Sequence, residues 1–208
     1  MIQLAIAGAA GRMGQSLISA CEGHESFALA HAFEQSGHES VGQSAGSGQS
    51  SVILTDGIDG PSFDVLIDFT SPVASLANLA FCAEHGRKAV IGTTGLSDSD
   101  RERMAELAKK TAVVWAPNMS VGVNITLRLL ELAARAFGDE VDVEIIEAHH
   151  RHKVDAPSGT ALKMGEVVAK ALDRTLDEHG VFARQGHTGP RTDKEIGFST
   201  IRAADVIG

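Results

Sequence analysis

Apolar runs of strand length alternate with helical patterns through the first half of the chain. Strands are predicted at residues 3–8, 27–34, 64–70, 88–95 and 112–118. Apolar residues at helical spacing predict helices at residues 12–22, 72–86 and 96–110. This alternation of strand and helix is typical of a parallel sheet that is covered by helices.

Local signals mark where several of these elements begin and end. Pro72 stands near the start of the second predicted helix and Gly86 just past its end, which are positions that these residue types favour. Ser97 and Asp98 are candidate N-caps of the third helix. Residues 35–51 are polar and rich in glycine and serine, which predicts a mobile surface loop.

The pattern changes after about Asn118. The second half predicts a long helix at residues 121–138, a β-rich run at 141–150, a helix at 158–172, and one or two strands at 197–208. Acidic and apolar residues alternate in the β-rich run, as on a half-solvated sheet. We therefore place a domain boundary near Val121, which gives domains of residues 1–120 and 121–208.

Composition and charge exclude several classes of function. The chain has 208 residues and a formal net charge of -9, which argues against nucleic acid as a partner because binding phosphates requires a basic face. No apolar run reaches membrane-spanning length, and the N-terminus lacks the features of a signal peptide. Cys21 and Cys82 lie far apart, which predicts reduced thiols in a cytoplasmic protein rather than a disulfide or a zinc site.

The first predicted turn, Gly8-Ala9-Ala10-Gly11-Arg12-Met13-Gly14, follows a strand and opens a helix. Small residues let the backbone approach a pyrophosphate, and a helix N-terminus supplies N–H groups. The middle glycine comes one residue later than in the usual dinucleotide fingerprint, but Glu34 ends the next strand, where an acidic residue would bind the ribose hydroxyls. We predict a dinucleotide site. The alternative is a tight turn that binds nothing, and the absence of a following Gly-Lys-Ser/Thr argues against a mononucleotide kinase.

Two later turns, residues 92–95 and 116–120, also stand at the ends of predicted strands. Ligands of open parallel sheets bind at the carboxyl ends of the strands. Backbone groups in these turns are therefore candidates for holding a nicotinamide carboxamide, although either turn alone would be an ordinary strand-to-helix connection.

The stretch EAHHRHKVDAPSGTA, which runs from Glu147 to Ala161, gathers basic and titratable groups in an acidic chain. A metal site is one interpretation, but the stretch has no CxxC, no histidines at helical i, i+4 spacing and no carboxylate partner in a known pattern. A solvated basic loop is another. We favour catalysis on an anion, because histidine can give a proton near neutral pH and lysine supplies positive charge or a second acid.

The residues Ser158-Gly159-Thr160 follow Pro157 and open a predicted helix. Their N–H groups and hydroxyls can bind a carboxylate, and Ser158 can at the same time cap the helix. A nucleotide in one domain and an acid–base and anion site in the other imply hydride transfer to an anionic substrate.

The same stretch closely resembles the signature of the dihydrodipicolinate reductase family, that is, 4-hydroxy-tetrahydrodipicolinate reductase. The runs AIAGAAGRMG, IDFTSP, VIGTTG and APNMSVGVN resemble further blocks of that family in the same order, over essentially the whole chain. The resemblance implies an α/β Rossmann-like cofactor domain and a mixed α+β domain for substrate binding and tetramerisation. It also implies reduction of a cyclic, unsaturated dicarboxylate imine with NADH or NADPH, in the diaminopimelate route to lysine.

The resemblance implies that His149 is the acid–base residue and Lys153 a second proton donor. His150, Gly159 and Thr160 match substrate-binding positions, to which the anion argument adds Ser158. The positions that match cofactor contacts are Gly8, Ala9, Ala10, Gly11, Arg12, Met13, Glu34, Gly92, Thr93, Thr94, Ala116, Pro117, Asn118 and Met119. No metal is implied. An intact pair of His149 and Lys153 argues against the alternative function, a nucleotide-sensing protein that has lost catalysis.

This sequence departs from the family in two ways. Gln35 and Ser71 stand where some members carry arginine, so we predict that NADH serves at least as well as NADPH, whose 2′-phosphate would meet Glu34. The family usually continues past Gly208 with further strands and a last helix, so we expect the second domain to be incomplete at its C-terminal end and less stable for it.

Overall fold

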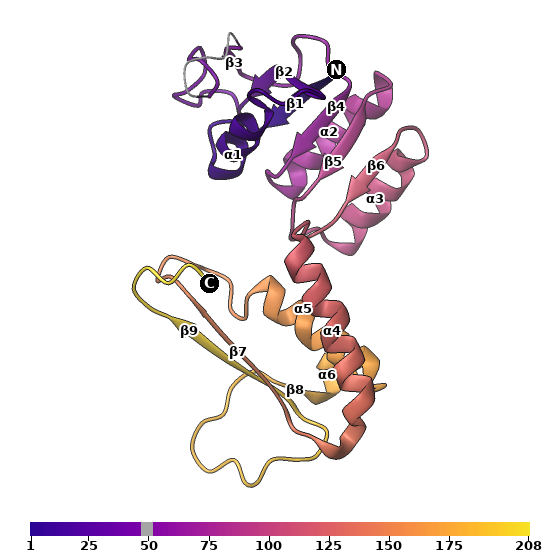
Figure 1. The fold of residues 1–208 in the computed structure, drawn as a ribbon, viewed down its shortest axis with the longest axis vertical. Helices are drawn as coiled ribbons and strands as arrows, with labels where there is room; N and C mark the ends of the chain where they lie inside the picture. The colour runs from indigo at the N-terminus through magenta and orange to yellow at the C-terminus, as the bar shows by residue number, and fades with distance from the viewer. Residues whose placement is uncertain (47–51) are drawn as a thin grey trace. The chain divides into compact units, whose positions relative to one another are not determined.

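In the computed structural model, which describes residues 1–46 and 52–208, the chain divides into two units. Unit 1 comprises Met1–Pro117 and unit 2 comprises Asn118–Gly208 (Figure 1). Each unit has a sheet of its own.

Unit 1 is built on a six-stranded parallel sheet. Its strands are β1 (Ile2–Ala7), β2 (Phe27–Phe33), β3 (Leu54–Thr55), β4 (Val65–Asp68), β5 (Lys88–Ile91) and β6 (Val113–Trp115). The strand order β3-β2-β1-β4-β5-β6 reverses direction at β1, as in dinucleotide-binding sheets. The predicted parallel α/β fold is confirmed, and β3 escaped prediction because two residues carry no periodic pattern.

Three helices cover the two faces of this sheet, namely α1 (Arg12–Cys21), α2 (Pro72–Glu84) and α3 (Asp98–Ala108) (Figure 1). Alternate strand residues point to opposite faces. Leu4 and Ile6 of β1 therefore pack with Ile18 of α1, whereas Leu66 of β4 packs with Leu79 of α2 on the other face. Each such buried side chain contributes about 1.5–3 kcal/mol.

The helix starts follow the predicted signals. Ser71 caps α2 ahead of Pro72, with its side chain accepting a hydrogen bond from the Ala74 N–H. Ser97 caps α3 in a reciprocal capping box with Asp100, while Asp98 is the first helical residue. Of the predicted loop at residues 35–51, residues 35–46 contain turns and one bridge from Ser44 to Ile53, and the remaining residues 47–51 lie outside the described part.

Unit 2 packs helices on a three-stranded sheet in the order β7-β9-β8. Its main elements are α4 (Val121–Phe137), β7 (Val143–His149), α5 (Gly159–Ala171) and β9 (Ile196–Arg202), with the short η1 (Gly138–Glu140), α6 (Leu176–His179) and β8 (Gly180–Val181). Both ladders are parallel. The core contains Val168 and Ala169 of α5 against Ile196 and Phe198 of β9. Residues 197–208, predicted as one or two strands, supply a single strand.

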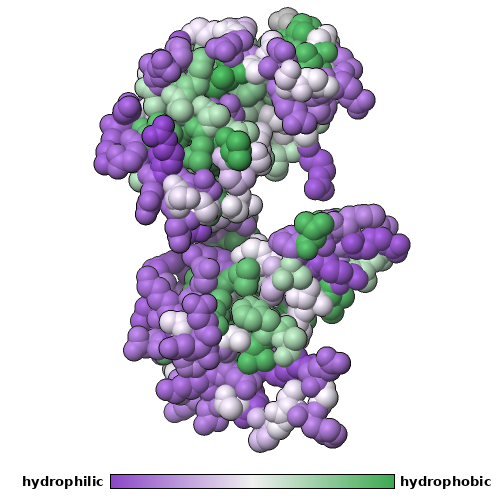
Figure 2. Space-filling model, turned by 180° about the vertical axis from the view of Figure 1, so that it is seen from behind, coloured by the Kyte–Doolittle hydropathy of each residue, from purple (hydrophilic) through white to green (hydrophobic). Residues whose placement is uncertain are grey.

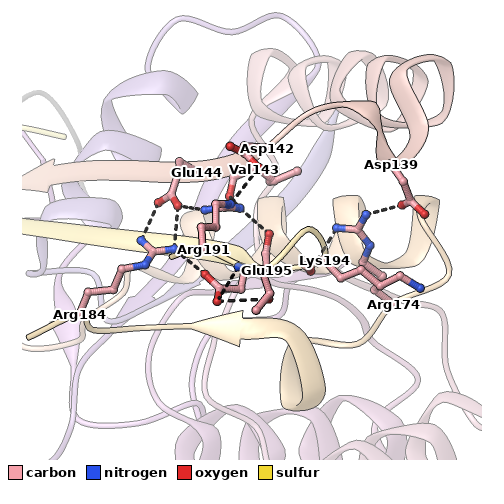
Figure 3. A network of polar contacts seen from close by, with 10 residues as sticks. Asp139, Asp142, Val143, Glu144, Arg174, Arg184, Arg191, Lys194 and Glu195 are labelled. Carbon is pink, nitrogen blue, oxygen red and sulfur yellow. Dashed lines mark hydrogen bonds and ion pairs between the residues drawn. The ribbon is translucent and has the colours of Figure 1, made fainter. Parts of the chain in front are cut away.

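A network of arginines and carboxylates ties the segment between β8 and β9 to the sheet (Figure 3). Arg184 donates to Glu144 of β7 at 2.8 and 3.2 Å and to Glu195 at 3.2 Å. Arg191 binds Glu144 and Asp142, and also donates to the carbonyl of Val143 at 2.9 Å. Ion pairs therefore hold Arg184 and Arg191 to β7, while Phe182 at the start of the segment stacks on Phe198 with ring centroids 4.8 Å apart.

Some apolar side chains are exposed, whereas both cysteine thiols are buried. The surface of each unit shows apolar patches among hydrophilic side chains (Figure 2), and Ile125, Leu129 and Leu132 of α4 are each more than half exposed. Cys21 and Cys82 are both free and buried, and burial raises the pKa of the Cys82 thiol to about 12. No helix within the described residues is long and apolar enough to cross a membrane.

Candidate functional site

The glycine loop of unit 1 brings the N-terminus of α1 against the end of β1. Gly8 has a φ of +64°, and a Cβ there would lie 2.9 Å from Cγ2 of Thr70. A Cβ on Gly14 would lie 2.2 Å from the carbonyl oxygen of Gly8, so only glycine lets the helix come this close. The N–H groups of Arg12, Met13 and Gly14 have no hydrogen-bond partner in the described part of the chain. A helix N-terminus with free N–H groups is suited to bind a pyrophosphate.

A cavity of about 560 Å³ opens beside this loop at the carboxyl ends of β1, β2 and β4. The residues that line it are Ala7, Gly8, Ala10, Gly11, Phe33, Glu34, Gln35, Ser36, His38, Asp56, Gly57, Ile58, Thr70, Ser71, Ala74 and Asn78. Six residues that the sequence singled out, Gly8, Ala10, Gly11, Glu34, Gln35 and Ser71, meet here. The cavity, the close-packed glycines and the free N–H groups together fit a dinucleotide.

Charge in this cavity is negative. Oε1 of Glu34 accepts a hydrogen bond from the Ala10 N–H at 2.9 Å, and Oε2 accepts one from the Gln35 N–H at 3.3 Å, so the carboxylate is fixed beside the glycine loop. Asp56 adds a second carboxylate that the sequence patterns did not indicate. Among the described residues that line the cavity there is no lysine or arginine, and His38 is the single titratable base.

Asp68 holds together the turns that surround the cavity. It is fully buried at the end of β4, and its carboxylate accepts hydrogen bonds from Thr70 N–H and Oγ1, Ser75 Oγ and Asn78 Nδ2, at 2.6–2.9 Å. Ser75 in turn contacts Thr93 Oγ1 at 2.6 Å. Asp68 therefore links the turn after β4 to α2 and to the turn after β5. Sequence reasoning assigned Asp68 no role.

The other predicted cofactor positions do not line the cavity. Ala9 and Gly92 are buried in turns, Thr93 belongs to the Asp68 network, and Thr94 is exposed. Residues 116–119 follow β6 at the division between the units. Their assignment remains a prediction.

In unit 2, the carboxylate of Glu147 is at the centre of the hydrogen-bond network around the histidine stretch. Its Oε2 lies 2.5 Å from Nδ1 of His149, and its Oε1 accepts the Ser158 N–H at 3.0 Å. Arg202 grips the same carboxylate with Nη1 at 2.8 Å and Nη2 at 2.9 Å. The hydrogen bonds from Arg202, followed by those from His149 and Ser158, lower the pKa of Glu147 to about 2.

Lys153 lies in the loop that follows β7. Its ammonium is 2.6 Å from Oδ1 of Asp155, and its side chain is 20% exposed, so the ammonium is partly shielded from water. This contact is the main reason that the pKa of Asp155 lies below its usual range. Nη2 of Arg202 donates to the Asp155 carbonyl at 2.6 Å and so connects this loop to the Glu147 carboxylate.

The N-terminus of α5 offers free donors beside these groups. Ser158 caps the helix by accepting the Ala161 N–H at 3.2 Å, and its own N–H is taken by Glu147. The N–H groups of Gly159 and Thr160 have no partner among the described residues, and no atom would come within 4 Å of a Cβ on Gly159. Free N–H groups at the start of a helix are suited to bind a carboxylate.

His150 and His152 lie beside each other in the loop, with ring centroids 6.2 Å apart. Nδ1 of His150 accepts the His152 N–H at 3.2 Å. Nowhere in the described ranges do three or more His, Cys, Asp or Glu side chains form a group that could hold a metal ion.

Sequence reasoning missed Arg202, Asp155 and the part played by Glu147. Glu147 and His149 are separated by one residue in a β run, so their side chains share a face, and that spacing was the available signal. Arg202 carried no such signal, because it is 55 residues away from Glu147.

Comparisons with known proteins find matches over almost the whole chain. Residues 2–119 match the family "Dihydrodipicolinate reductase, N-terminus" and residues 122–208 match "Dihydrodipicolinate reductase, C-terminus". A 4-hydroxy-tetrahydrodipicolinate reductase from Chromohalobacter salexigens is 57% identical, over 100% of this chain and 80% of the relative.

Two solved structures extend the comparison. A dipicolinate-bound dihydrodipicolinate reductase from Paenisporosarcina sp. TG-14 has a TM-score of 0.73 at 27% identity, covering 100% of this chain and 80% of that one. An aspartate semialdehyde dehydrogenase II from Vibrio cholerae has a TM-score of 0.52 at 14% identity, over 100% of this chain and 69% of that one, which shows a shared fold alone.

Proposed function

The chain belongs to the dihydrodipicolinate reductase family, and on that premise we propose that it reduces the cyclic imine 4-hydroxy-tetrahydrodipicolinate to tetrahydrodipicolinate with a nicotinamide cofactor, in the diaminopimelate route to lysine. One observation in this chain carries the proposal. A single carboxylate, Glu147, contacts both the His149 imidazole and the N-terminus of α5, so a proton donor lies beside free N–H groups that suit an anionic substrate.

The proposed substrate is a dicarboxylate. The N–H groups of Gly159 and Thr160, supported by the positive end of the α5 dipole, bind one carboxylate. Ser158 contributes its hydroxyl, which can donate while it accepts the Ala161 N–H. His150, next to His149, completes the substrate-binding set. The relative from Paenisporosarcina sp. TG-14 is a dipicolinate complex, which supports a planar dicarboxylate as ligand.

Loss of the 4-hydroxyl group as water leaves an imine conjugated with a carbon–carbon double bond. Reduction of this system to tetrahydrodipicolinate needs a hydride at its terminal carbon and a proton on the anion that results. The hydride comes from the reduced nicotinamide. His149 gives the proton from the ring nitrogen that does not face Glu147, and Lys153 is the second proton donor and a fixed positive charge near the substrate carboxylates. Asp155 competes for Lys153, so binding of the anionic substrate must draw the ammonium away from a contact of 2.6 Å.

The proposed cofactor positions are those of the glycine loop, Glu34 and the turns after β5 and β6. The free N–H groups at the start of α1 bind the pyrophosphate, and Glu34 accepts from the ribose hydroxyls. We propose that NADH serves at least as well as NADPH. The support is electrostatic, because Glu34 and Asp56 line the cavity and its described lining holds no lysine or arginine to bind a 2′-phosphate.

A cytoplasmic location, which rests on the two separate cysteines, and a homotetrameric assembly, which rests on the family resemblance, complete the proposal. Neither nucleic acid nor a membrane is proposed as a partner. The net charge of -9 supports the first of these, since phosphate binding requires a basic face.

The variants His149→Gln and Lys153→Ala test the function. Each should keep the fold and cofactor binding but lower kcat by about 100- to 10,000-fold, the usual contribution of a positioned general acid. The double variant should lose less than the product of the two losses, because groups acting as a unit are not additive. Cofactor oxidation in the presence of substrate is the assay, and cofactor binding is measured by fluorescence titration.

Matched controls lie close by. His152→Gln changes an exposed histidine of the same loop, and Lys163→Ala changes an exposed lysine of α5 that pairs with Glu166. Both should keep kcat within about twofold, as expected for surface changes away from the site. If His149→Gln and Lys153→Ala turn over like these controls, the assignment is wrong. An unmutated chain that binds cofactor but oxidises none would favour the alternative of a nucleotide sensor, which the comparisons do not support.

A further inference from the structure

Glu147 lies two positions before His149 on β7, so the two side chains project from the same face of the strand. Resting on the proposed role of His149 as proton donor, we propose that Glu147 is a positioning residue that keeps a proton on Nδ1 of His149. Nε2 is then the nitrogen that gives its proton to the substrate. Arg202 holds the Glu147 carboxylate in this position. Sequence reasoning gave neither Glu147 nor Arg202 a role.

The geometry of the contact decides which nitrogen carries the proton. Nδ1 of His149 and Oε2 of Glu147 are 2.5 Å apart, so one of them must donate. An ionised carboxylate can only accept. Because its pKa is lowered to about 2, Glu147 is ionised near neutral pH, and Nδ1 therefore donates in both the neutral and the charged ring. Nε2 has no hydrogen-bond partner among the described residues.

Arg202 fixes the carboxylate from the neighbouring strand. In the parallel ladder of β7 and β9, Arg202 is the register partner of His149, and its guanidinium reaches diagonally to Glu147. The grip is bidentate, which sets the plane of the carboxylate as well as its position. The side chains of Arg202 and Glu147 are only 17% and 10% exposed, so water competes little for the pair.

The same two residues tie the rest of the site to His149. Oε1 of Glu147 holds the Ser158 N–H, which places the start of α5 relative to the imidazole. Arg202 also donates to the carbonyl of Asp155, whose side chain binds Lys153. The pair therefore fixes the proton donor, the carboxylate-binding helix end and the lysine loop in one frame, and holding reacting groups in place is itself a large part of catalysis.

The chemical step follows from this arrangement. The 4-hydroxyl group of the substrate leaves as water, which gives an imine conjugated with a carbon–carbon double bond. The Nε2–H bond of the His149 imidazolium breaks, its electron pair stays on Nε2, and the proton goes to the anion that forms when the terminal carbon of this conjugated system accepts the hydride. The ring is left neutral with its remaining proton on Nδ1, facing Glu147. A ring with its proton on Nε2 instead would turn its lone pair on Nδ1 toward a carboxylate, which offers no donor.

Nitrogen NMR of the histidine rings tests the proposal on the unmutated protein. The chain has nine histidines, and the signal missing from His149→Gln assigns the ring of interest. At a pH where that ring is neutral, we expect the Nδ1–H tautomer. An Nε2–H tautomer would overturn the proposal, and this measurement needs neither catalysis nor a variant at Glu147.

Glu147→Gln is the matched perturbation, and Glu144→Gln is its control. Glu144 lies on the same strand and also binds two arginines, Arg184 and Arg191 (Figure 3), but it forms no hydrogen bond or ion pair with a histidine among the described residues. Glu147→Gln should mix or reverse the tautomer of His149 and lower kcat by about 10- to 100-fold, a part of what a general acid contributes. KM should change far less. Glu144→Gln should leave the tautomer and kcat unchanged, whatever it does to stability.

A double-mutant cycle separates this proposal from the function on which it rests. In the His149→Gln background, Glu147→Gln should lower kcat by no more than about twofold, because the group it positions is gone. An equal loss in both backgrounds would overturn the positioning role, even with His149 confirmed as the acid. If His149→Gln itself keeps full kcat, the proposed function fails, while the ring spectra of unmutated protein and Glu147→Gln still decide whether Glu147 sets the tautomer.

Discussion

Replacing Gly14 by alanine should destabilise unit 1, although alanine is the better helix former. Gly14 is the third residue of α1 and is buried against the turn that enters the helix. A Cβ added there would lie 2.2 Å from the Gly8 carbonyl oxygen, 2.6 Å from Cα of Ala9 and 2.7 Å from the Ala9 carbonyl oxygen. Real Cβ atoms essentially never approach another atom within 3.0 Å, and all three neighbours are backbone atoms that cannot rotate away.

The magnitude follows from two opposing effects. The helix or the loop must move by about 1 Å to admit the methyl group, and overpacking of that kind costs about 1–3 kcal/mol or more. The intrinsic preference of helices for alanine over glycine returns at most about 1 kcal/mol. Because all three clashing atoms are backbone, we take the upper end of the overpacking cost and expect a net loss of about 2 kcal/mol. Cofactor affinity should fall as well, because the displaced loop carries the N–H groups proposed to bind the pyrophosphate.

Gly122→Ala is the control, because Gly122 lies in the first turn of α4. The nearest atom to a Cβ on Gly122 is Oγ of Ser120 at 3.8 Å, an ordinary contact. Here the backbone preference acts without a clash, and unit 2 should gain about 0.4–1 kcal/mol. The same substitution in the first turns of two helices should thus have opposite signs.

Urea unfolding is the assay, followed by one probe of unit 1 and one of the whole chain. Trp115 is the single tryptophan and belongs to β6, so its fluorescence follows unit 1, while circular dichroism follows the helices of both units. A Gly14→Ala variant within about 0.5 kcal/mol of the unmutated chain, the range of an ordinary surface change, would refute the reasoning. Equal losses in Gly14→Ala and Gly122→Ala would refute it too, since the effect would then not depend on the close approach.

Three further predictions concern charge. Asp68→Ala should cost about 2–3 kcal/mol in urea unfolding, because it takes the acceptor from the buried Ser75 hydroxyl and from the part-buried donors of Thr70 and Asn78. Asp64→Ala removes one exposed acceptor and should cost no more than about 1 kcal/mol; similar losses in the two variants would contradict this. Arg202, His149 and Ser158 lower the pKa of Glu147 from 4.5 to about 2, so the folded state gains up to about 3 kcal/mol from the ionised carboxylate. This stabilisation is complete above pH 4.5 and is lost as the pH falls through 2. Acid unfolding of Glu147→Gln should lack this pH dependence, and an unaltered acid transition would contradict the prediction. The kcat/KM value for NADH should equal or exceed that for NADPH. A preference for NADPH beyond about tenfold, or about 1.4 kcal/mol, would contradict the prediction that Glu34 repels the 2′-phosphate. Gln35→Arg should shift the ratio toward NADPH.

The order and type of the main elements could be predicted because they depend on neighbours in the chain. A buried strand such as β4 or an amphipathic helix such as α1 repeats its pattern within a few residues, and caps such as Ser97 act within one turn. Elements too short to show a period, such as β3 and β8, could not be predicted in this way.

The candidate site was likewise predictable only where its residues are neighbours in the sequence. His149, Lys153 and the start of α5 belong to one continuous stretch, so the sequence alone determined that a histidine, a lysine and a helix N-terminus would be neighbours. That Asp56 joins Glu34 in the cavity, and that Arg202 binds the carboxylate behind His149, was decided only by tertiary structure. Pairing of β7 with β9 brings together residues 55 positions apart, and no local period records which strands will be neighbours, because that choice depends on how whole elements pack.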